Sequence, residues 1–114
     1  MSDQALKYRT ESQNNFLFYK KLMPEIARAY DELPSEVYKD GALSGKTKRL
    51  MALCGALVHG CHGCQLAQAD MALELGASVD EILETCSVAI SLGGTMGAAE
   101  TTNVVQFLKE KGLV

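Results

Sequence analysis

The apolar residues of this chain recur at helical spacing in several segments, and none of those segments shows the strict alternation that is typical of a half-buried strand. Its glycines fall between the helical patterns rather than in hairpin turns. With 114 residues, the chain is long enough to bury one hydrophobic core but too short for two. We therefore predict an all-α fold of five to six helices in a single domain over residues 1–114.

The N-terminal third contains a helical pattern from about Glu11 to Leu33, with Pro24 inside it. Proline removes a backbone donor and clashes with the preceding turn, but it is well tolerated in the first turn of a helix. We therefore expect a kink or a second helix that begins at Pro24. A separate short turn of helix is expected from Pro34, with Ser35 as its cap.

The remaining helices have clearer boundaries. We predict helices at about residues 44–58, 61–76, 78–93 and 95–111. Gly76 is placed as the left-handed residue that follows a helix end, and Ser78 with Glu81 forms a capping-box pattern at the start of the next helix. The pair Gly93-Gly94 is expected to end that helix.

Composition narrows the classes of function. The net charge is -3 and no basic cluster is long enough to neutralise several phosphates, so we expect no nucleic-acid partner. The chain starts without a positive segment leading into an apolar run, and no stretch approaches about 20 consecutive apolar residues. We expect no membrane partner and a cytoplasmic protein, in which closely spaced cysteines indicate redox chemistry or metal binding before structural disulfides.

Two segments, 51–58 and 88–99, are apolar or small around nearly the whole circumference of their helices. Such helices need to be covered on more than one side, and a monomer of this size has few elements with which to cover them. We therefore predict a homo-oligomer with a helical interface.

The segment CGALVHGCHGC contains three of the four cysteines and both histidines. Cys61 and Cys64 are three residues apart at a predicted helix start, within disulfide reach. The unpaired amides and the positive dipole end of a helix N-terminus stabilise a thiolate over a thiol. A thiolate is the attacking species in thiol-disulfide exchange, so this pair is the candidate catalytic site.

Other interpretations of these residues remain open. The pair could consist of ordinary small residues, or it could bind zinc together with His59 and His62, although four ligands within six residues around one helix start would be geometrically awkward. We expect no metal and no cofactor. His59 is interpreted as a surface residue, and His62 either faces solvent or tunes the thiols. Cys54 and Cys86 lie in apolar stripes and are expected in the core.

The run from about residue 46 to residue 94 resembles the alkylhydroperoxidase D-like or carboxymuconolactone decarboxylase family. The matching pieces are KTKRLMALCGAL, HGCHGC, QADMALELGASVDEILE and SVAISLGG. The resemblance implies a helical bundle built around a central helical hairpin, a family-like core at about residues 40–111, and assembly into homotrimers or homohexamers. Thiol members of the family reduce peroxides or accept electrons from disulfide proteins through the CxxC pair, whereas decarboxylase members generally lack it.

The resemblance carries the catalytic role to Cys61 and Cys64, with Cys64 as the attacking thiol and Cys61 as its partner. The family's redox members have a glutamate where this chain has Arg49 and a histidine where it has Gln68. Arg49, Gln68 and His62 are therefore candidate tuning residues. One interpretation of Arg49 is a cation that favours the thiolate, and the other is an arginine that flanks an apolar stripe and reaches water.

These observations predict a CxxC thiol-disulfide oxidoreductase or hydroperoxide reductase, with antioxidant, peroxiredoxin-type activity. Its partners would be copies of itself, a small peroxide and a dithiol electron-donor protein. The first alternative is a non-catalytic oligomeric thiol protein or redox sensor, because Arg49 and Gln68 replace a proton acceptor and a proton donor. A lactone decarboxylase is the least favoured interpretation.

Overall fold

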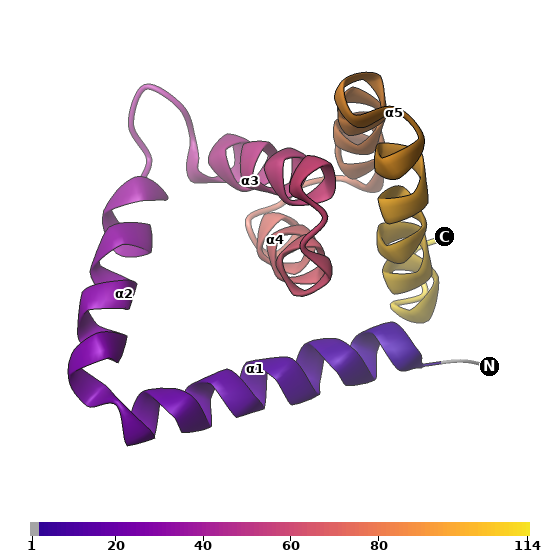
Figure 1. Ribbon diagram of the computed structural model, residues 1–114. Helices are drawn as coiled ribbons and strands as arrows, with labels where there is room; N and C mark the ends of the chain where they lie inside the picture. Colours follow the sequence, from indigo (N-terminus) through magenta and orange to yellow (C-terminus); the bar gives the residue numbers. More distant parts are fainter. Residues whose placement is uncertain (1–2) are drawn as a thin grey trace.

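The computed structural model describes residues 3–114 and confirms the predicted all-α fold. The helices are α1 (Gln4–Leu22), α2 (Pro24–Val37), α3 (Gly45–His59), α4 (His62–Glu74) and α5 (Val79–Glu110). No strand occurs within residues 3–114. Figure 1 shows α3, α4 and α5 gathered into one body, with α1 passing below it and α2 standing at its side.

The core lies between α3, α4 and α5, with the start of α1 closing one end of it. α3 and α4 form the central helical hairpin, and the joint between them is only two residues long. Gly60 ends α3 in the left-handed conformation (φ 82°), which glycine adopts without a side-chain clash. The largest fully buried apolar side chains are Leu53, Leu57, Leu66, Ile82, Cys86, Val104, Phe107 and Leu108.

α5 bends sharply at Gly94, whose backbone (φ 60°, ψ -135°) is outside the helical region. The predicted stop at Gly93-Gly94 is therefore confirmed, although helix resumes immediately and no loop separates the two arms. After the bend, Gly97 lies so close to the first arm that an added Cβ would be 2.6 Å from the Ala89 carbonyl oxygen. The bend and this close approach fold α5 into an elbow, which Figure 1 shows.

Of the two helix starts expected at prolines, the one at Pro24 is confirmed and the one at Pro34 is wrong. Pro24 begins α2, as predicted, and α1 begins at Gln4, earlier than expected. Pro34 does not begin a separate turn but lies inside α2. No residue of α2 is buried, so the Tyr30 carbonyl that loses its donor to Pro34 is in an exposed helix that water reaches.

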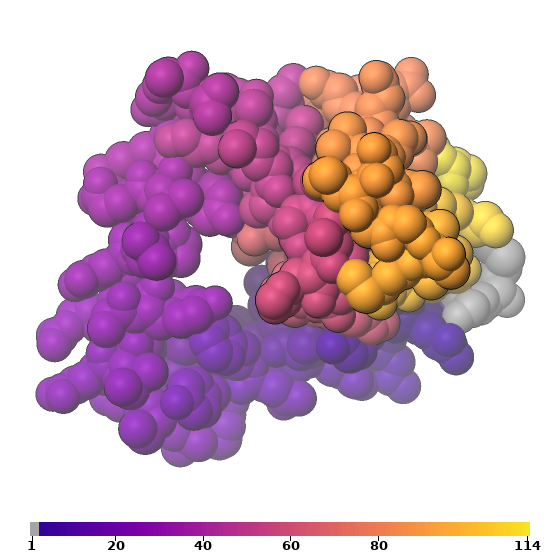
Figure 2. All heavy atoms as spheres, turned by 45° about the horizontal axis from the view of Figure 1, so that its top comes forward, coloured from indigo at the N-terminus to yellow at the C-terminus, as the bar shows by residue number. Residues whose placement is uncertain are grey.

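The second half of α1 together with α2 forms an arm, residues 13–37, that stands away from the body. Among the described helices, α2 packs against α1 alone, and Figure 2 shows an opening between the arm and the body. Many large apolar side chains of the arm are exposed: Phe16, Leu17, Phe18, Tyr19, Leu22, Met23, Ile26, Tyr30, Leu33 and Val37.

α5 is the one helix within residues 3–114 that is long and apolar enough to cross a membrane, judged by length and composition alone. Polar residues interrupt its apolar runs, so no stretch of about 20 consecutive apolar residues occurs in it. The bend at Gly94 divides it into two arms, each shorter than the ~20 residues that a straight span needs. Core helices of soluble proteins pass the same test of composition, so this property does not place the chain in a membrane.

Candidate functional site

Cys61 and Cys64 are joined by a disulfide at the first turn of α4, with their Cα atoms 5.2 Å apart. Cys61 is the N-cap residue in extended conformation, and its Sγ accepts a hydrogen bond from the Cys64 backbone N–H at 3.3 Å. Because Gly60 turns the chain and Cys61 caps the new helix, the pair is held at the helix N-terminus. This geometry stabilises negative charge on Cys61 Sγ once the disulfide is reduced.

The two cysteines differ in exposure. Cys64 is exposed, whereas Cys61 is half-buried. An external reagent therefore has freer access to Cys64. Cys61 is the better leaving group, since the helix N-terminus stabilises its thiolate and a stabilised thiolate leaves faster in disulfide exchange.

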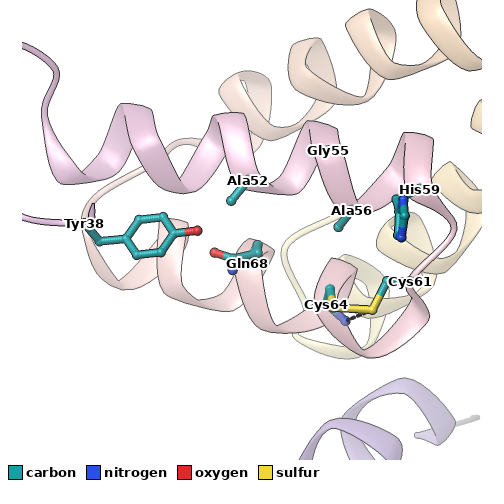
Figure 3. A pocket seen from close by; sticks show the side chains of 8 residues that line it. All are labelled: Tyr38, Ala52, Gly55, Ala56, His59, Cys61, Cys64 and Gln68. Carbon is teal, nitrogen blue, oxygen red and sulfur yellow. Dashed lines mark hydrogen bonds between the residues drawn. A yellow bond between two sulfur atoms is a disulfide. The ribbon is translucent and has the colours of Figure 1, made fainter. Parts of the chain in front are cut away.

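The pair opens onto a shallow hollow of about 360 Å³, which we call the cysteine hollow. Figure 3 shows that small residues of α3 form one wall of the hollow and that α4 forms the other. Its lining residues are Tyr38, Ala52, Gly55, Ala56, His59, Cys61, Cys64 and Gln68. The small side chains at Ala52, Gly55 and Ala56 leave space above the sulfur atoms for an organic molecule.

Gln68 and Arg49 are the two departures from the family pattern. Gln68 lines this hollow, and Arg49, which is not one of the lining residues, contacts Gln68 from α3. The Arg49 Nη1 donates a hydrogen bond to Gln68 Oε1 at 3.1 Å. The guanidinium also stacks over the Tyr38 ring, with its Cζ 3.5 Å from the ring centroid. Stacking and hydrogen bonding orient the guanidinium. The role of Arg49 at the thiols stays a prediction.

The two histidines differ in their relation to the cysteine hollow. His62 is exposed and stacks on Tyr8 of α1, with the ring centroids 4.5 Å apart, and it does not line the cysteine hollow. His59, which the sequence suggested as an ordinary surface residue, is exposed but lines the hollow beside Cys61. The structure therefore brings Cys61, Cys64 and Gln68 together with His59 rather than with His62.

Sequence reasoning missed a buried polar cluster directly behind the cysteines. Gln65 is fully buried, and its Nε2 donates to Glu100 Oε2 at 2.8 Å. Asn103 Nδ2 donates to Gln65 Oε1 and to Glu100 Oε2, both at 3.0 Å. The available signal was Gln65 itself, which shares the buried face of α4 with Ala69 and Ala72 at i+4 and i+7.

Cys54 and Cys86 are free and pack in or against the core, as predicted. Desolvation by burial raises the pKa of the Cys86 thiol, which keeps it in the unreactive protonated form. Within residues 3–114, no three His, Cys, Asp or Glu side chains lie close enough together to hold a metal ion.

Comparison with known proteins gives consistent matches. Residues 24–107 match the sequence profile of the carboxymuconolactone decarboxylase family. The chain is similar to an uncharacterised protein of Cupriavidus necator, with 26% identity over 98 residues that cover 86% of this chain and 87% of that protein.

Two solved structures have the same fold. The apo structure of a carboxymuconolactone decarboxylase family protein from Legionella pneumophila has a TM-score of 0.89 and 28% identity, covering 96% of this chain and 97% of that one. A family protein from Thermotoga maritima, described with a possible involvement in antioxidative response, has a TM-score of 0.69 and 33% identity, covering 74% and 87%. The first match covers nearly the whole chain.

Proposed function

The chain belongs to the carboxymuconolactone decarboxylase family, and from that premise we propose that it is a thiol-disulfide oxidoreductase that reduces hydroperoxides through Cys61 and Cys64. The observation that carries the proposal is the disulfide at the N-terminus of α4, with the exposed sulfur of Cys64 facing an open hollow. The description of the Thermotoga maritima relative, which mentions an antioxidative response, supports the same class of chemistry.

In the oxidative half-reaction, the Cys64 thiolate attacks the distal oxygen of the hydroperoxide and the O–O bond breaks. The alkoxide takes a proton from water and leaves as the alcohol, and Cys64 becomes a sulfenic acid. The Cys61 thiolate then attacks Cys64 Sγ, the disulfide forms, and hydroxide leaves as water once it is protonated. Two thiols and one hydroperoxide thus give a disulfide, an alcohol and water.

In the reductive half-reaction, a dithiol protein returns the pair to its reduced form. Its thiolate attacks Cys64, which is the exposed sulfur, and the Cys61 thiolate leaves. The second thiol of the donor then attacks the mixed disulfide and releases Cys64. The N-cap position of Cys61 favours this direction of attack because it stabilises the departing negative charge.

The first test is the mass and thiol count of the reduced protein before and after mild peroxide. We expect a loss of about 2 Da on the peptide containing the pair, reversed by a dithiol and by thioredoxin. In Cys61→Ser, the sulfenic acid on Cys64 should be trapped by a dimedone label, whereas Cys64→Ser should take up little label. Cys54→Ser, which changes a free cysteine outside the pair, should behave as the wild type. A pair that stays reduced, or turnover that survives the double serine variant, would refute the proposal.

A redox sensor is the second candidate, and the contact between Arg49 and Gln68 favours it. Neither side chain supplies the proton acceptor or donor that the family's redox members have at these positions. A sensor would cycle between dithiol and disulfide, but a chemical dithiol would have to reduce it after each oxidation by peroxide. Steady turnover with a protein donor distinguishes the enzyme from the sensor.

We further infer that the protein acts in the cytoplasm as a homotrimer or homohexamer. The exposed apolar residues of the arm and the exposed Met51, Val88, Leu92 and Met96 support self-association, because isolated soluble monomers rarely expose so many large apolar side chains together. A reducing compartment is also where a cycling dithiol pair would meet a dithiol donor.

A further inference from the structure

Arg49 is a permanent cation beside the cysteine hollow, in contact with the lining residues Gln68 and Tyr38, and the structure shows no acidic partner for it among the described residues. None of the ion pairs within residues 3–114 includes it. A guanidinium has five N–H donors, and the one hydrogen bond found here goes to a neutral amide oxygen on Gln68. The group therefore retains both its charge and most of its donors for a ligand.

The charged residues close to Arg49 in the sequence have partners of their own. Asp40, in the loop before α3, accepts its hydrogen bond from the Gly45 backbone N–H rather than from Arg49. Lys46 is paired with Glu81, and Lys48 donates to the Lys39 carbonyl oxygen. None of these three charged groups pairs with the Arg49 guanidinium.

We propose that the oxidant taken up by this site is an organic hydroperoxide that carries a carboxylate, with the carboxylate bound by Arg49 and the peroxide presented to Cys64. This inference rests on the proposed function, because it names the substrate class of the same site. A planar carboxylate matches the fork of a guanidinium, and such charge-assisted pairs are among the strong hydrogen bonds of proteins.

The spacing of the residues limits the length of the substrate. Cys64 and Gln68 are one helical turn apart on α4, about 5–6 Å between their Cβ atoms, and Arg49 reaches Gln68 from α3. The space between is bounded by Ala52, Gly55 and Ala56. A compact apolar spacer, such as one aromatic ring, would lie against this wall while its two ends meet the sulfur and the guanidinium.

The experiment compares a hydroperoxide acid with its own neutral ester. The first pair is para-carboxycumene hydroperoxide and its methyl ester, and the second is linoleic acid hydroperoxide and its methyl ester. Oxidation of the reduced pair is followed by stopped-flow or by coupled turnover, and the readout is the acid-to-ester ratio of kcat/KM. We expect a ratio of about ten for the compact pair, carried mostly by KM and falling as salt is added.

The variants distinguish an effect of the Arg49 charge from an effect of the protein's overall positive charge. Arg49→Gln should bring the acid-to-ester ratio close to one, and Arg49→Lys should retain part of it, because lysine keeps the charge but not the fork. The matched control is Lys48→Gln, which removes one positive charge from the same helix at a side chain that contacts Lys39, and it should keep the wild-type ratio.

The outcomes are distinguishable. A preference for linoleic acid hydroperoxide over its ester, without a preference for the compact acid, would contradict the spacing argued above and would overturn this inference. Ratios near one for both pairs, with esters and acids oxidising Cys61 and Cys64 equally, would overturn this inference and leave the proposed function intact. If no hydroperoxide oxidises the pair, the proposed function fails and this inference fails with it.

Discussion

At the scale of single residues, Gln65 is the clearest link between the cysteine turn and the rest of the molecule. Its amide is fully buried yet satisfied, since it donates to Glu100 and accepts from Asn103. Both partners lie on the second arm of α5, so the cluster ties the first turn of α4 to that arm. The position of Cys64, the adjacent residue, depends on this tie.

Gln65→Leu should therefore destabilise the protein by about 1–3 kcal/mol, because Glu100 and Asn103, both half-buried, would each lose one hydrogen-bond partner and keep only the bond between them. The matched control is Gln68→Leu, one turn along the same helix, where the side chain lines the open hollow and the cost should be small. Urea denaturation of the two reduced variants measures the difference. Equal midpoints would contradict the structural role assigned to the cluster.

Residue by residue, the site was predictable where its chemistry is local in sequence. Cys61 and Cys64 were identified because their spacing and the helix start are both contained in a short segment. The contact of Gln65 with Glu100 spans 35 positions, and the stacking of Arg49 on Tyr38 joins a helix to a preceding loop. Such contacts depend on how helices pack, which periodicity alone does not specify.

At the scale of elements, the elbow of α5 depends on two glycines with different roles. Gly94 has a backbone conformation that side chains rarely adopt, and Gly97 leaves no room for a Cβ beside the Ala89 carbonyl. Gly97→Ala should open the elbow and lower the melting temperature, because backbone atoms rather than a flexible side chain occupy the space. Gly93→Ala is the control, since its Cβ would be 4.0 Å from Val58 and would clash with nothing. A Gly93→Ala variant as unstable as Gly97→Ala would show that the whole bend, rather than the close approach, is sensitive.

The N-terminus of α1 is held by one carboxylate. Glu110, at the end of α5, accepts hydrogen bonds from the Ala5 and Leu6 backbone N–H groups at 3.1 and 2.8 Å. Desolvation alone would raise the pKa of Glu110, but the hydrogen bonds from Leu6, Gln106 and Ala5 outweigh it and hold the pKa below the ordinary value of a glutamate. A depressed folded-state pKa contributes stability that is present above the unfolded value and is lost as the pH falls through the folded value.

We therefore expect α1 to loosen from the body in acid, as the pH falls through the lowered pKa of Glu110, while the core of α3, α4 and α5 persists. Hydrogen exchange of the amides at the start of α1, measured from pH 7 to pH 3, tests this. Glu110→Gln should show the loosened state at neutral pH, because a neutral amide is a weaker acceptor for two backbone donors. If α1 stays protected in Glu110→Gln, other contacts hold it, and the stacking of Tyr8 on His62 becomes the first candidate.

Element boundaries were predictable where a cap or a glycine marks them. Ser44 and Ser78 each accept the hydrogen bond of an N-cap, and Gly60 and Gly76 take the left-handed conformation. Pro34 misled the prediction because a proline in an exposed helix loses one backbone hydrogen bond that water replaces. The sequence predicted a helix end at the elbow of α5 but not the elbow itself, since no local signal tells how closely two arms will pack.

At the scale of the whole molecule, the contacts within a single chain do not explain the exposed apolar side chains of the arm. Apolar side chains of α2 recur at i, i+4, i+7 and i+11, namely Ile26, Tyr30, Leu33 and Val37, and all are exposed. That spacing is the core-facing stripe of an amphipathic helix, yet among the helices found within residues 3–114 only α1 contacts α2. A second copy of the chain is the partner we propose for the stripe.

Leu33→Glu should shift the protein from its assembled form toward monomer in sedimentation velocity at micromolar concentration. Leu33 is 68% exposed in the single chain, so its loss removes no intramolecular core contact, and any large effect must come from the surface it covers in a partner. Ser35→Glu adds the same charge two residues later on the opposite side of α2 and should leave the assembly unchanged. A wild-type protein that sediments as a monomer would refute the assembly itself. Equal dissociation by the two variants would instead attribute the effect to charge on α2 and would remove the apolar stripe as the interface.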